Sequence, residues 1–285
     1  MKITKAVITS AARNQRTLPL QMLTDRNGKQ KTVLAIILDE AWEASIEQCC
    51  VVICPGDEDA FREAAGEKSS ERLQFVTQEE PRGYGHAIHC ARKFTGDQPF
   101  LHMIGDHIYV SDSEENCASQ LIKTASEHDC AVSGIQPTRE NLLPLFGTVG
   151  GSRVRGTQDL FEIEQVIEKP TPTQAEQTLF VPGLRTGHYL CFFGMHVLTP
   201  LTMALLEERI GESPEAVIPL SPVLNDLAKH ERYLALETKG KRYPLDVRYG
   251  LLTAQLALGL SGADREEVLA GLCELLAQRQ MGKGN

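Results

Sequence analysis

The sequence has no long apolar run, and this absence limits the class of protein. Of its 285 residues, 42% are hydrophobic and 24% are charged, which is the composition of a folded globular chain. No apolar stretch approaches the roughly 18 residues that a membrane-spanning helix needs. Residues 1–9 show neither a signal-peptide layout nor a small-residue cleavage site. We therefore expect a cytoplasmic protein with no membrane partner.

Basic residues are also few. The chain has 29 Lys and Arg against 38 Asp and Glu, a formal net charge of −9. Binding to a nucleic-acid backbone requires basic surface, so we expect no nucleic-acid partner. A small phosphorylated ligand remains compatible with this charge, because it needs only local cations, metal ions or backbone N–H groups.

The cysteines form no CxxC motif, although there are eight of them. Several lie inside apolar runs, such as residues 50–54, where thiols behave as small hydrophobic groups. We therefore expect neither a disulfide framework nor a cysteine metal site.

Apolar runs alternate with helix-like segments in the first half of the chain. The expected strands are 5–9, 50–54, 73–76, 99–104 and 130–135. The expected helices are 33–45, 58–67, 85–93 and 114–127. This alternation predicts a βαβ series, hence a parallel sheet covered on both faces. In such sheets the ligand crevice lies beyond the carboxyl ends of the strands.

The pattern changes near residue 146, where longer strand-like segments follow. They are expected at 146–151, 160–168 and 187–194, and they predict a mixed-sheet lobe over the crevice. Residues 263–280 carry a leucine stripe at helical spacing, which predicts a helix packed on its own domain; a subunit contact is the alternative. We expect one domain over 1–285, divided into a first half at 1–140, a second half at 141–255 and a helical tail at 256–285.

The turn after the first strand carries the first specific motif. Residues 10–19 resemble the A-A-G-x-G-T-R-x-x-P turn of sugar-nucleotide pyrophosphorylases, whose backbone wraps the nucleotide phosphates. Arg16 and Pro19 match the motif, whereas Ala12 and Asn14 replace its glycines. Asn14 can adopt the left-handed conformation of a glycine more readily than most residues.

The next family motif, P-K-E-M-L, aligns with residues 19–23 after a shortened loop. On this alignment Leu20 replaces the lysine and Gln21 replaces the glutamate. Charge neutralisation supplies much of the catalysis in phosphoryl transfer, so another cation has to compensate. The candidates are Arg13, Lys29 and Lys31.

Residues 78–88 resemble the family motif Q-x(4)-G-L-G-H-A-V. The resemblance implies that Gln78 and Gly83 meet the nucleotide base. A side-chain amide can read donors and acceptors together, and a glycine lets the base lie against the backbone.

Asp106 follows the expected strand 99–104, at the place where the family carries an Mg²⁺-binding aspartate. A second candidate is Asp246, because residues 240–250 resemble the family's G-x(4)-D-x-G stretch. A hard cation held by one or two carboxylates and phosphate oxygens is usual in nucleotide chemistry.

Two further segments point to a sugar phosphate. Residues 146–149 resemble Y-G-V-V, and residues 166–170 reproduce V-x-E-K-P. The resemblance implies that Glu168 accepts hydrogen bonds from sugar hydroxyls and that Lys169 meets the sugar phosphate. Residues 186–189 match x-G-R-Y, with a histidine in place of the arginine.

These motifs occur in family order from residue 6 to about 254. The chain therefore resembles the bacterial UTP–glucose-1-phosphate uridylyltransferases. This resemblance implies a three-layer α/β/α, Rossmann-like nucleotidyltransferase fold with a mixed sheet and a sugar-binding lobe, Mg²⁺ as cofactor, and an NTP and a sugar 1-phosphate as substrates. By resemblance the catalytic residues are Arg16, Asp106 and Lys169, and the metal ligands are Asp106 and Asp246. The implied nucleotide-binding residues are Ala11, Ala12, Asn14, Gln21, Gln78 and Gly83, and the implied sugar-phosphate-binding residues are Gly147, Glu168, Lys169 and Gly187.

Other functions remain open at this point. One is a nucleotidyltransferase that uses dTTP, CTP or another acceptor. A second is a non-catalytic nucleotide-sugar sensor, which the substituted first loop motivates. A dinucleotide-binding oxidoreductase is disfavoured because no G-x-G-x-x-G follows the first strand. Homo-oligomerisation also remains open.

Overall fold

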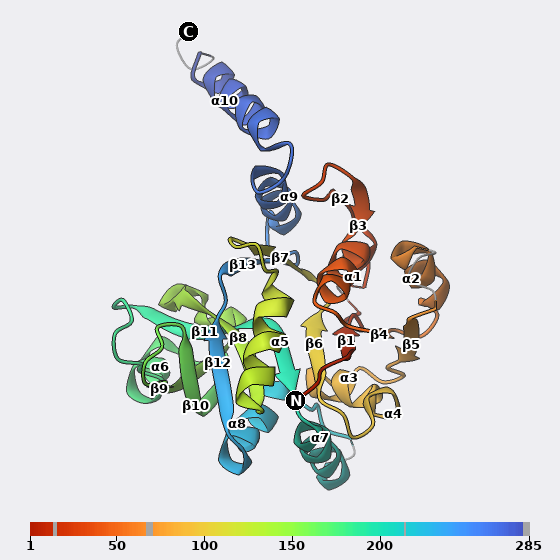
Figure 1. Cartoon of the computed structure of the whole chain (residues 1–285), viewed down its shortest axis with the longest axis vertical. Coiled ribbons are helices and arrows are strands. Elements are labelled where there is room, and N and C mark those ends of the chain that lie inside the picture. Colours follow the sequence, from red (N-terminus) through yellow and green to blue (C-terminus); the bar gives the residue numbers. More distant parts are fainter. Residues whose placement is uncertain (14–15, 67–70, 214, 282–285) are drawn as a thin grey trace.

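The computed structural model describes residues 1–13, 16–66, 71–213 and 215–281, and these are built around one nine-stranded mixed sheet (Figure 1). In their order across the sheet, the strands are β5 (Leu73–Thr77), β4 (Gln48–Ile53), β1 (Lys5–Thr9), β6 (Phe100–Ile104), β11 (His188–Leu198), β8 (Ala131–Arg139), β12 (Tyr233–Glu237), β10 (Leu160–Glu168) and β9 (Gly147–Arg153). The mixed α/β architecture predicted from the sequence is confirmed.

Strand direction divides this sheet into two parts. β5, β4, β1 and β6 are parallel, as the βαβ pattern predicts. β11 then runs antiparallel to both β6 and β8, so it joins the parallel part to the rest. β9 pairs with β10 and also with β11, and the sheet therefore curls back on itself at that edge.

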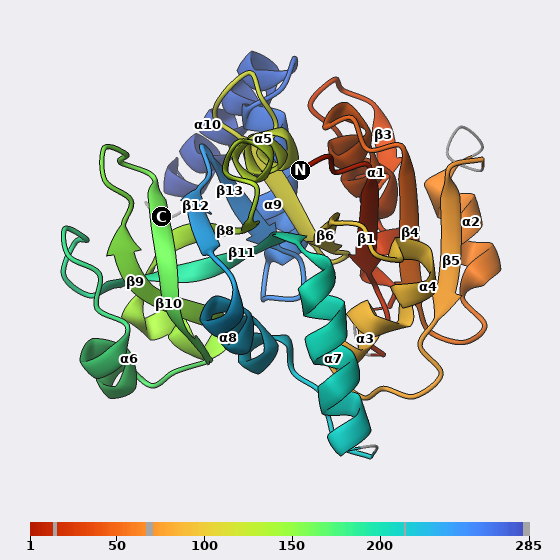
Figure 2. The same ribbon diagram turned by 60° about the horizontal axis from the view of Figure 1, so that its bottom comes forward.

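Helices cover both faces of the sheet (Figure 2). One face packs against α1 (Val33–Glu43), α2 (Glu58–Ala65) and α5 (Cys117–His128). The other packs against α3 (Tyr84–Cys90), α4 (Arg92–Thr95), α7 (Pro200–Glu212) and α8 (Leu220–His230). Because both faces are covered, successive residues of one strand are buried in opposite cores. In β1, Ala6 and Ile8 contact the first core and Val7 contacts the second.

Side-chain caps set the starts of two of these helices. Thr32 Oγ1 accepts from the amide of Ala35 at 3.0 Å before α1, and Asn116 Oδ1 accepts from the amide of Ser119 at 2.8 Å before α5. Such caps satisfy backbone donors that have no partner within the helix.

Shorter elements surround the sheet. They are η1 (Leu18–Leu20), the β2 (Met22–Thr24) and β3 (Gln30–Thr32) hairpin, the antiparallel pair β7 (His107–Ser111) and β13 (Gly240–Pro244), η3 (Glu140–Leu145), α6 (Pro172–Thr178), α9 (Gly250–Leu260) and α10 (Arg265–Met281).

The last helix, α10, projects away from the rest of the molecule (Figure 1). Its Leu269, Leu275 and Leu276 are 40%, 57% and 63% exposed. The prediction that this leucine stripe packs on its own domain is therefore wrong for these three residues. Within the described part of the chain, no helix combines the length and apolar character that crossing a bilayer requires.

Candidate active site

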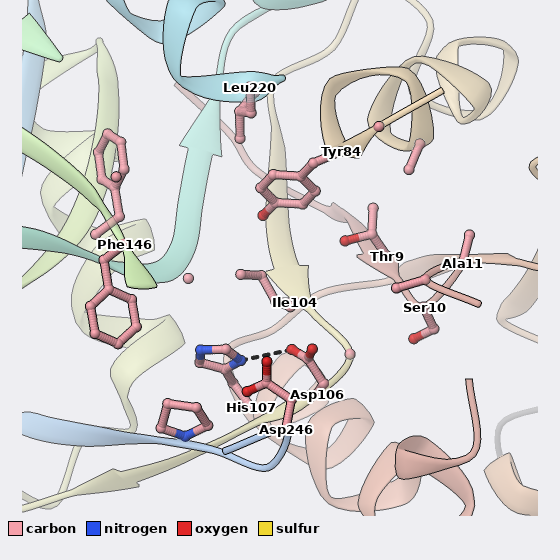
Figure 3. A pocket seen from close by; sticks show the side chains of 18 of the residues that line it. Thr9, Ser10, Ala11, Tyr84, Ile104, Asp106, His107, Phe146, Leu220 and Asp246 are labelled. Carbon is pink, nitrogen blue, oxygen red and sulfur yellow. Dashed lines mark hydrogen bonds and ion pairs between the residues drawn. The ribbon is translucent and has the colours of Figure 1, made fainter. Parts of the chain in front are cut away.

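A cavity of about 640 Å³ opens at the carboxyl ends of β1 and β6, where the parallel sheet predicts a crevice. Figure 3 shows the segment Thr9–Ala11 on one side of it and Phe146 on the other. Nine of the predicted site residues line this cavity: Ala11, Ala12, Gln78, Gly83, Asp106, Gly147, Glu168, Lys169 and Asp246.

The loop before α3 forms the end of the cavity predicted to bind the base. Gly83 has φ +94°, and an added Cβ would lie 2.9 Å from the carbonyl oxygen of Ile218, so this position requires glycine. Gln78 Nε2 donates to the carbonyl of Gly83 at 3.1 Å and lies 3.0 Å from His86 Nδ1. A carbonyl only accepts, so the atom facing Gly83 is the amide nitrogen. The amide oxygen of Gln78 is therefore the group that it can offer to a ligand.

The orientation of the Gln78 amide depends on the protonation of His86. Because the amide nitrogen donates, His86 Nδ1 has to be the unprotonated ring nitrogen. Burial, with the charge of Arg82, lowers the pKa of His86 below its ordinary value. The neutral imidazole is therefore favoured.

The two predicted metal-binding carboxylates lie on the same side of the cavity. Asp106 sits in the turn between β6 and β7, and Asp246 follows β13, which pairs with β7. The amide of Leu245 donates to the carbonyl of Asp106 at 2.9 Å, which ties the two segments together. Figure 3 shows both carboxyl groups beside His107, whose Nδ1 lies 2.7 Å from Asp106 Oδ1.

Gly147, Glu168 and Lys169, the lining residues predicted to bind the sugar phosphate, come from β9, the end of β10 and the position after it. Glu168 Oε2 accepts a hydrogen bond from the hydroxyl of Ser221, and Lys169 Nζ lies 4.0 Å from Glu168 Oε1. A Cβ on Gly147 would lie 2.7 Å from the hydroxyl oxygen of Ser221. Gly147 therefore leaves the space that Ser221 needs to hold Glu168. An acceptor and a cation side by side suit a ligand that carries both hydroxyl and anionic groups.

Arg16, the predicted catalytic cation of the first loop, is not among the residues that line the cavity. Its guanidinium instead pairs with Asp57, just before α2, while 45% of its side chain remains exposed. Arg13 does line the cavity. Lys31 is held by Asp25 at 2.8 Å and by Asp39 at 2.6 Å. Of the three compensating cations expected from the sequence, Arg13 is therefore the one placed at the site.

Two other predicted nucleotide- or sugar-binding positions, Gln21 and Gly187, are not brought to the cavity. The exposed side chain of Gln21 donates to the carbonyl of Thr17 at 3.2 Å. Gly187, at φ +71°, accepts from the amide of Glu140 at 3.0 Å, away from the cavity lining. Asn14 lies outside the described residues. The roles assigned to them remain predictions.

The structure also places residues at the site to which the sequence assigned no role. Among them are Tyr84, His107, His196 and Ser221. Tyr84 lies within a recognised motif and His107 directly follows one, so their position in the sequence could have pointed to the site. His196 and Ser221 lie in no recognised motif. They line the cavity because the tertiary structure brings β11 and the start of α8 to it. Burial lowers the pKa of His196 to about 3, so this imidazole is neutral.

The chain belongs to the nucleotidyl transferase family, whose model matches residues 16–233. This confirms the family predicted from the motifs. The curated relatives include the UTP–glucose-1-phosphate uridylyltransferase of Bacillus subtilis, 26% identical over 98% of this chain and 99% of that protein. The UTP–glucose-1-phosphate uridylyltransferase 2 of Streptococcus pyogenes serotype M3 is 25% identical over 91% of each.

Solved structures share the same fold. A UTP-bound UDP-glucose pyrophosphorylase from Acinetobacter baumannii superposes with a TM-score of 0.74 at 22% identity, over 96% of this chain and all of that one. A UDP-glucose pyrophosphorylase in complex with UDP-glucose superposes with a TM-score of 0.72 at 21% identity, over 90% and 98%.

Proposed function

We propose that this chain transfers a uridylyl group from UTP to glucose 1-phosphate, forming UDP-glucose and pyrophosphate. The observation that carries this proposal is that the base-side loop, the acidic pair and Glu168–Lys169 all line one cavity. In the reaction, an oxygen of the sugar phosphate attacks the α-phosphorus in line. The new P–O bond forms as the bond to the bridging oxygen breaks, and pyrophosphate leaves with that electron pair.

The Gln78 amide supports a uracil-like base. The oxygen of this amide is an acceptor, because Gly83 and His86 engage its nitrogen. Uracil and thymine carry an imide N–H that donates to such an acceptor. At the corresponding ring position cytosine and adenine have an unprotonated nitrogen. This nitrogen and the Gln78 amide oxygen are both acceptors, so they cannot form a hydrogen bond with each other. The geometry therefore favours UTP or dTTP over CTP and ATP.

The acidic pair fits a magnesium ion. Among the residues that the structure describes, no group of three or more His, Cys, Asp or Glu side chains could hold a metal. Mg²⁺ does not need such a cage, since it is usually held by one or two carboxylates together with phosphates and water. Asp106 and Asp246 would hold the ion, which would neutralise charge on the reacting phosphates. His107 fixes the Asp106 carboxylate in place.

The remaining roles belong to side chains at the two ends of the cavity. Glu168, oriented by Ser221, accepts hydrogen bonds from the hexose hydroxyls. Lys169 binds the sugar phosphate and holds its oxygen against the α-phosphorus. Arg13, and Arg16 once it leaves Asp57, stabilise the triphosphate and the departing pyrophosphate.

Pyrophosphate release tests this proposal directly. With glucose 1-phosphate and Mg²⁺, we expect turnover of about 1 s⁻¹ or faster with UTP and much slower turnover with CTP or ATP. Asp106→Ala should lower kcat by at least about 100-fold, because a positioned charge of this kind is typically worth that much. Asp97→Ala, which removes an exposed carboxylate outside the cavity, is the matched control. Full activity of Asp106→Ala at saturating Mg²⁺ would refute the metal assignment.

A non-catalytic nucleotide-sugar sensor is the second candidate. It is favoured by the pairing of Arg16 with Asp57 and by Leu20 at the place of the motif's lysine. This candidate predicts that UDP-glucose raises the melting temperature while no NTP yields pyrophosphate. Turnover near 1 s⁻¹ would exclude it.

A further inference from the structure

Tyr84 places a hydroxyl group at the floor of the cavity. It is the first residue of α3 and lines the cavity, and Figure 3 shows its ring pointing inward beside Leu220 and above Ile104. Its ring meets that of His102 edge-on, with centroids 5.3 Å apart. A tyrosine held this way presents a polar atom in an otherwise largely apolar part of the wall.

His102 holds the Tyr84 hydroxyl from behind. This histidine is fully buried on β6, with Nδ1 3.3 Å from the Tyr84 hydroxyl and Nε2 3.2 Å from Thr9 Oγ1. Burial, together with His196, lowers the pKa of His102 well below its usual range. A neutral imidazole has one donor and one acceptor, and here both have a hydroxyl partner. The three side chains therefore form a short relay that orients Tyr84.

This relay leaves Tyr84 hydrogen-bonding capacity on the cavity side. The side chain of Thr9 also hydrogen-bonds the Tyr84 hydroxyl. With His102 and Thr9 both satisfied, the Tyr84 oxygen keeps one lone pair in either tautomer of His102. A ligand hydroxyl can donate to this lone pair, whereas a phosphate oxygen only accepts and cannot. The geometry therefore favours a ligand hydroxyl.

Charged residues from two parts of the site act on Tyr84. Burial first, then Tyr109, Asp106 and Glu168, raise its pKa well above the ordinary value for tyrosine. The phenol therefore stays neutral and acts as a hydrogen-bonding group rather than as a base. Asp106 and Glu168 line the same cavity as Tyr84, and the charges of both act on its phenol.

We propose that the Tyr84 hydroxyl, positioned by His102, hydrogen-bonds a hydroxyl of the bound nucleotide sugar and is a specificity-determining residue of this site. The inference rests on the proposed function and extends it. The contacted hydroxyl belongs either to the ribose or to the hexose. Deoxy analogues distinguish these sources because each lacks one hydroxyl.

Calorimetric titration with UDP-glucose tests the contact without requiring turnover. Tyr84→Phe keeps the ring and removes the hydroxyl, and we expect it to weaken UDP-glucose binding roughly 5- to 30-fold, the effect of one lost hydrogen bond. For the deoxy analogue that lacks the contacted hydroxyl, Tyr84→Phe and the wild type should bind within about twofold of each other. Tyr189→Phe, at a buried tyrosine outside the cavity lining, is the matched control.

A double-mutant cycle tests the positioning role of His102. We expect His102→Leu to weaken UDP-glucose binding in the wild type but not further in Tyr84→Phe, because the two residues act through one hydroxyl. If His102 had a purely structural role, the losses of binding free energy caused by the two substitutions would add up in the double variant. Thermal unfolding checks that each variant is folded, and Tyr84→Phe decides the proposal even if His102→Leu fails to fold.

The two ways of failing are distinct. If the wild type binds UDP-glucose and folded Tyr84→Phe binds it equally well, the Tyr84 contact is refuted. An equal loss with every deoxy analogue refutes it as well, because the group that Tyr84 contacts would then not be a sugar hydroxyl. If the wild type binds no nucleotide sugar, the proposed function is refuted, and this inference is refuted with it.

Discussion

Asp57 holds Arg16, the cation proposed to stabilise the triphosphate. Its carboxylate pairs with Arg16, whereas its side chain makes no capping hydrogen bond to α2. On the proposed function, a triphosphate and Asp57 compete for the same guanidinium. At the residue scale, NTP binding then has to break this ion pair.

Asp57→Asn should therefore strengthen NTP binding. An ion pair with a partly exposed arginine is worth up to about 1 kcal/mol, so we expect the KM for UTP to fall by up to about fivefold. Steady-state kinetics with varied UTP check this. Glu58→Gln is the control, because Glu58 pairs with Arg62 and not with Arg16. A KM that is unchanged or raised in Asp57→Asn would contradict the competition.

Single residues show how far the motifs predict the site. Gln78, Gly83, Glu168 and Lys169 line the cavity as expected, because each belongs to a motif that is short and local. Arg16 was also matched to its motif, but its ion pair depends on Asp57, which lies after a different strand. A pairing of this kind follows from the tertiary structure and leaves no trace in residue spacing.

At the scale of elements, a carboxyl group from one helix supports the start of another. Glu40 of α1 accepts from the amide of Ala118 at 2.9 Å through Oε1, at the beginning of α5. A helix N-terminus favours a nearby negative charge. Burial outweighs this effect and, with the charge of Glu43, raises the pKa of Glu40 from 4.5 to about 7.

The stability of the α1–α5 contact should therefore fall as pH rises. Between pH 4.5 and about 7 the folded chain keeps a proton on Glu40 that the unfolded chain has lost. Over this window we expect the free energy of unfolding to decrease by up to about 3 kcal/mol from this group. Urea titrations across the window measure the slope. Glu40→Gln should flatten it, and an equal slope in that variant would contradict the assignment.

The elements themselves were predicted unevenly. The strands at 5–9 and 160–168 were predicted with the bounds that the structure has, because burial on both faces, or strict alternation, leaves a clear pattern. The β7–β13 pair was not predicted, since it joins Tyr109 to Arg242 across almost half of the chain. Local periodicity carries no information about such a partner.

For the molecule as a whole, α10 stands apart from the main core. Its exposed leucines, Leu269, Leu275 and Leu276, contrast with Phe193 of β11, which is fully buried in the main core. Replacing the three leucines with serine should change the free energy of unfolding by less than about 0.5 kcal/mol. Phe193→Ala should cost about 3–5 kcal/mol. Denaturant titration at low protein concentration compares them, and a large loss in the serine variant would show that α10 is covered in solution.

The hydrogen bond from Leu245 to Asp106 also has a consequence for protein synthesis. The turn that carries Asp106 leaves the ribosome long before the segment around residue 245 has been translated. Between the synthesis of these two segments, the nascent chain contains Asp106 but not Asp246. A product that terminates before the second segment lacks Asp246 and therefore cannot form the acidic pair.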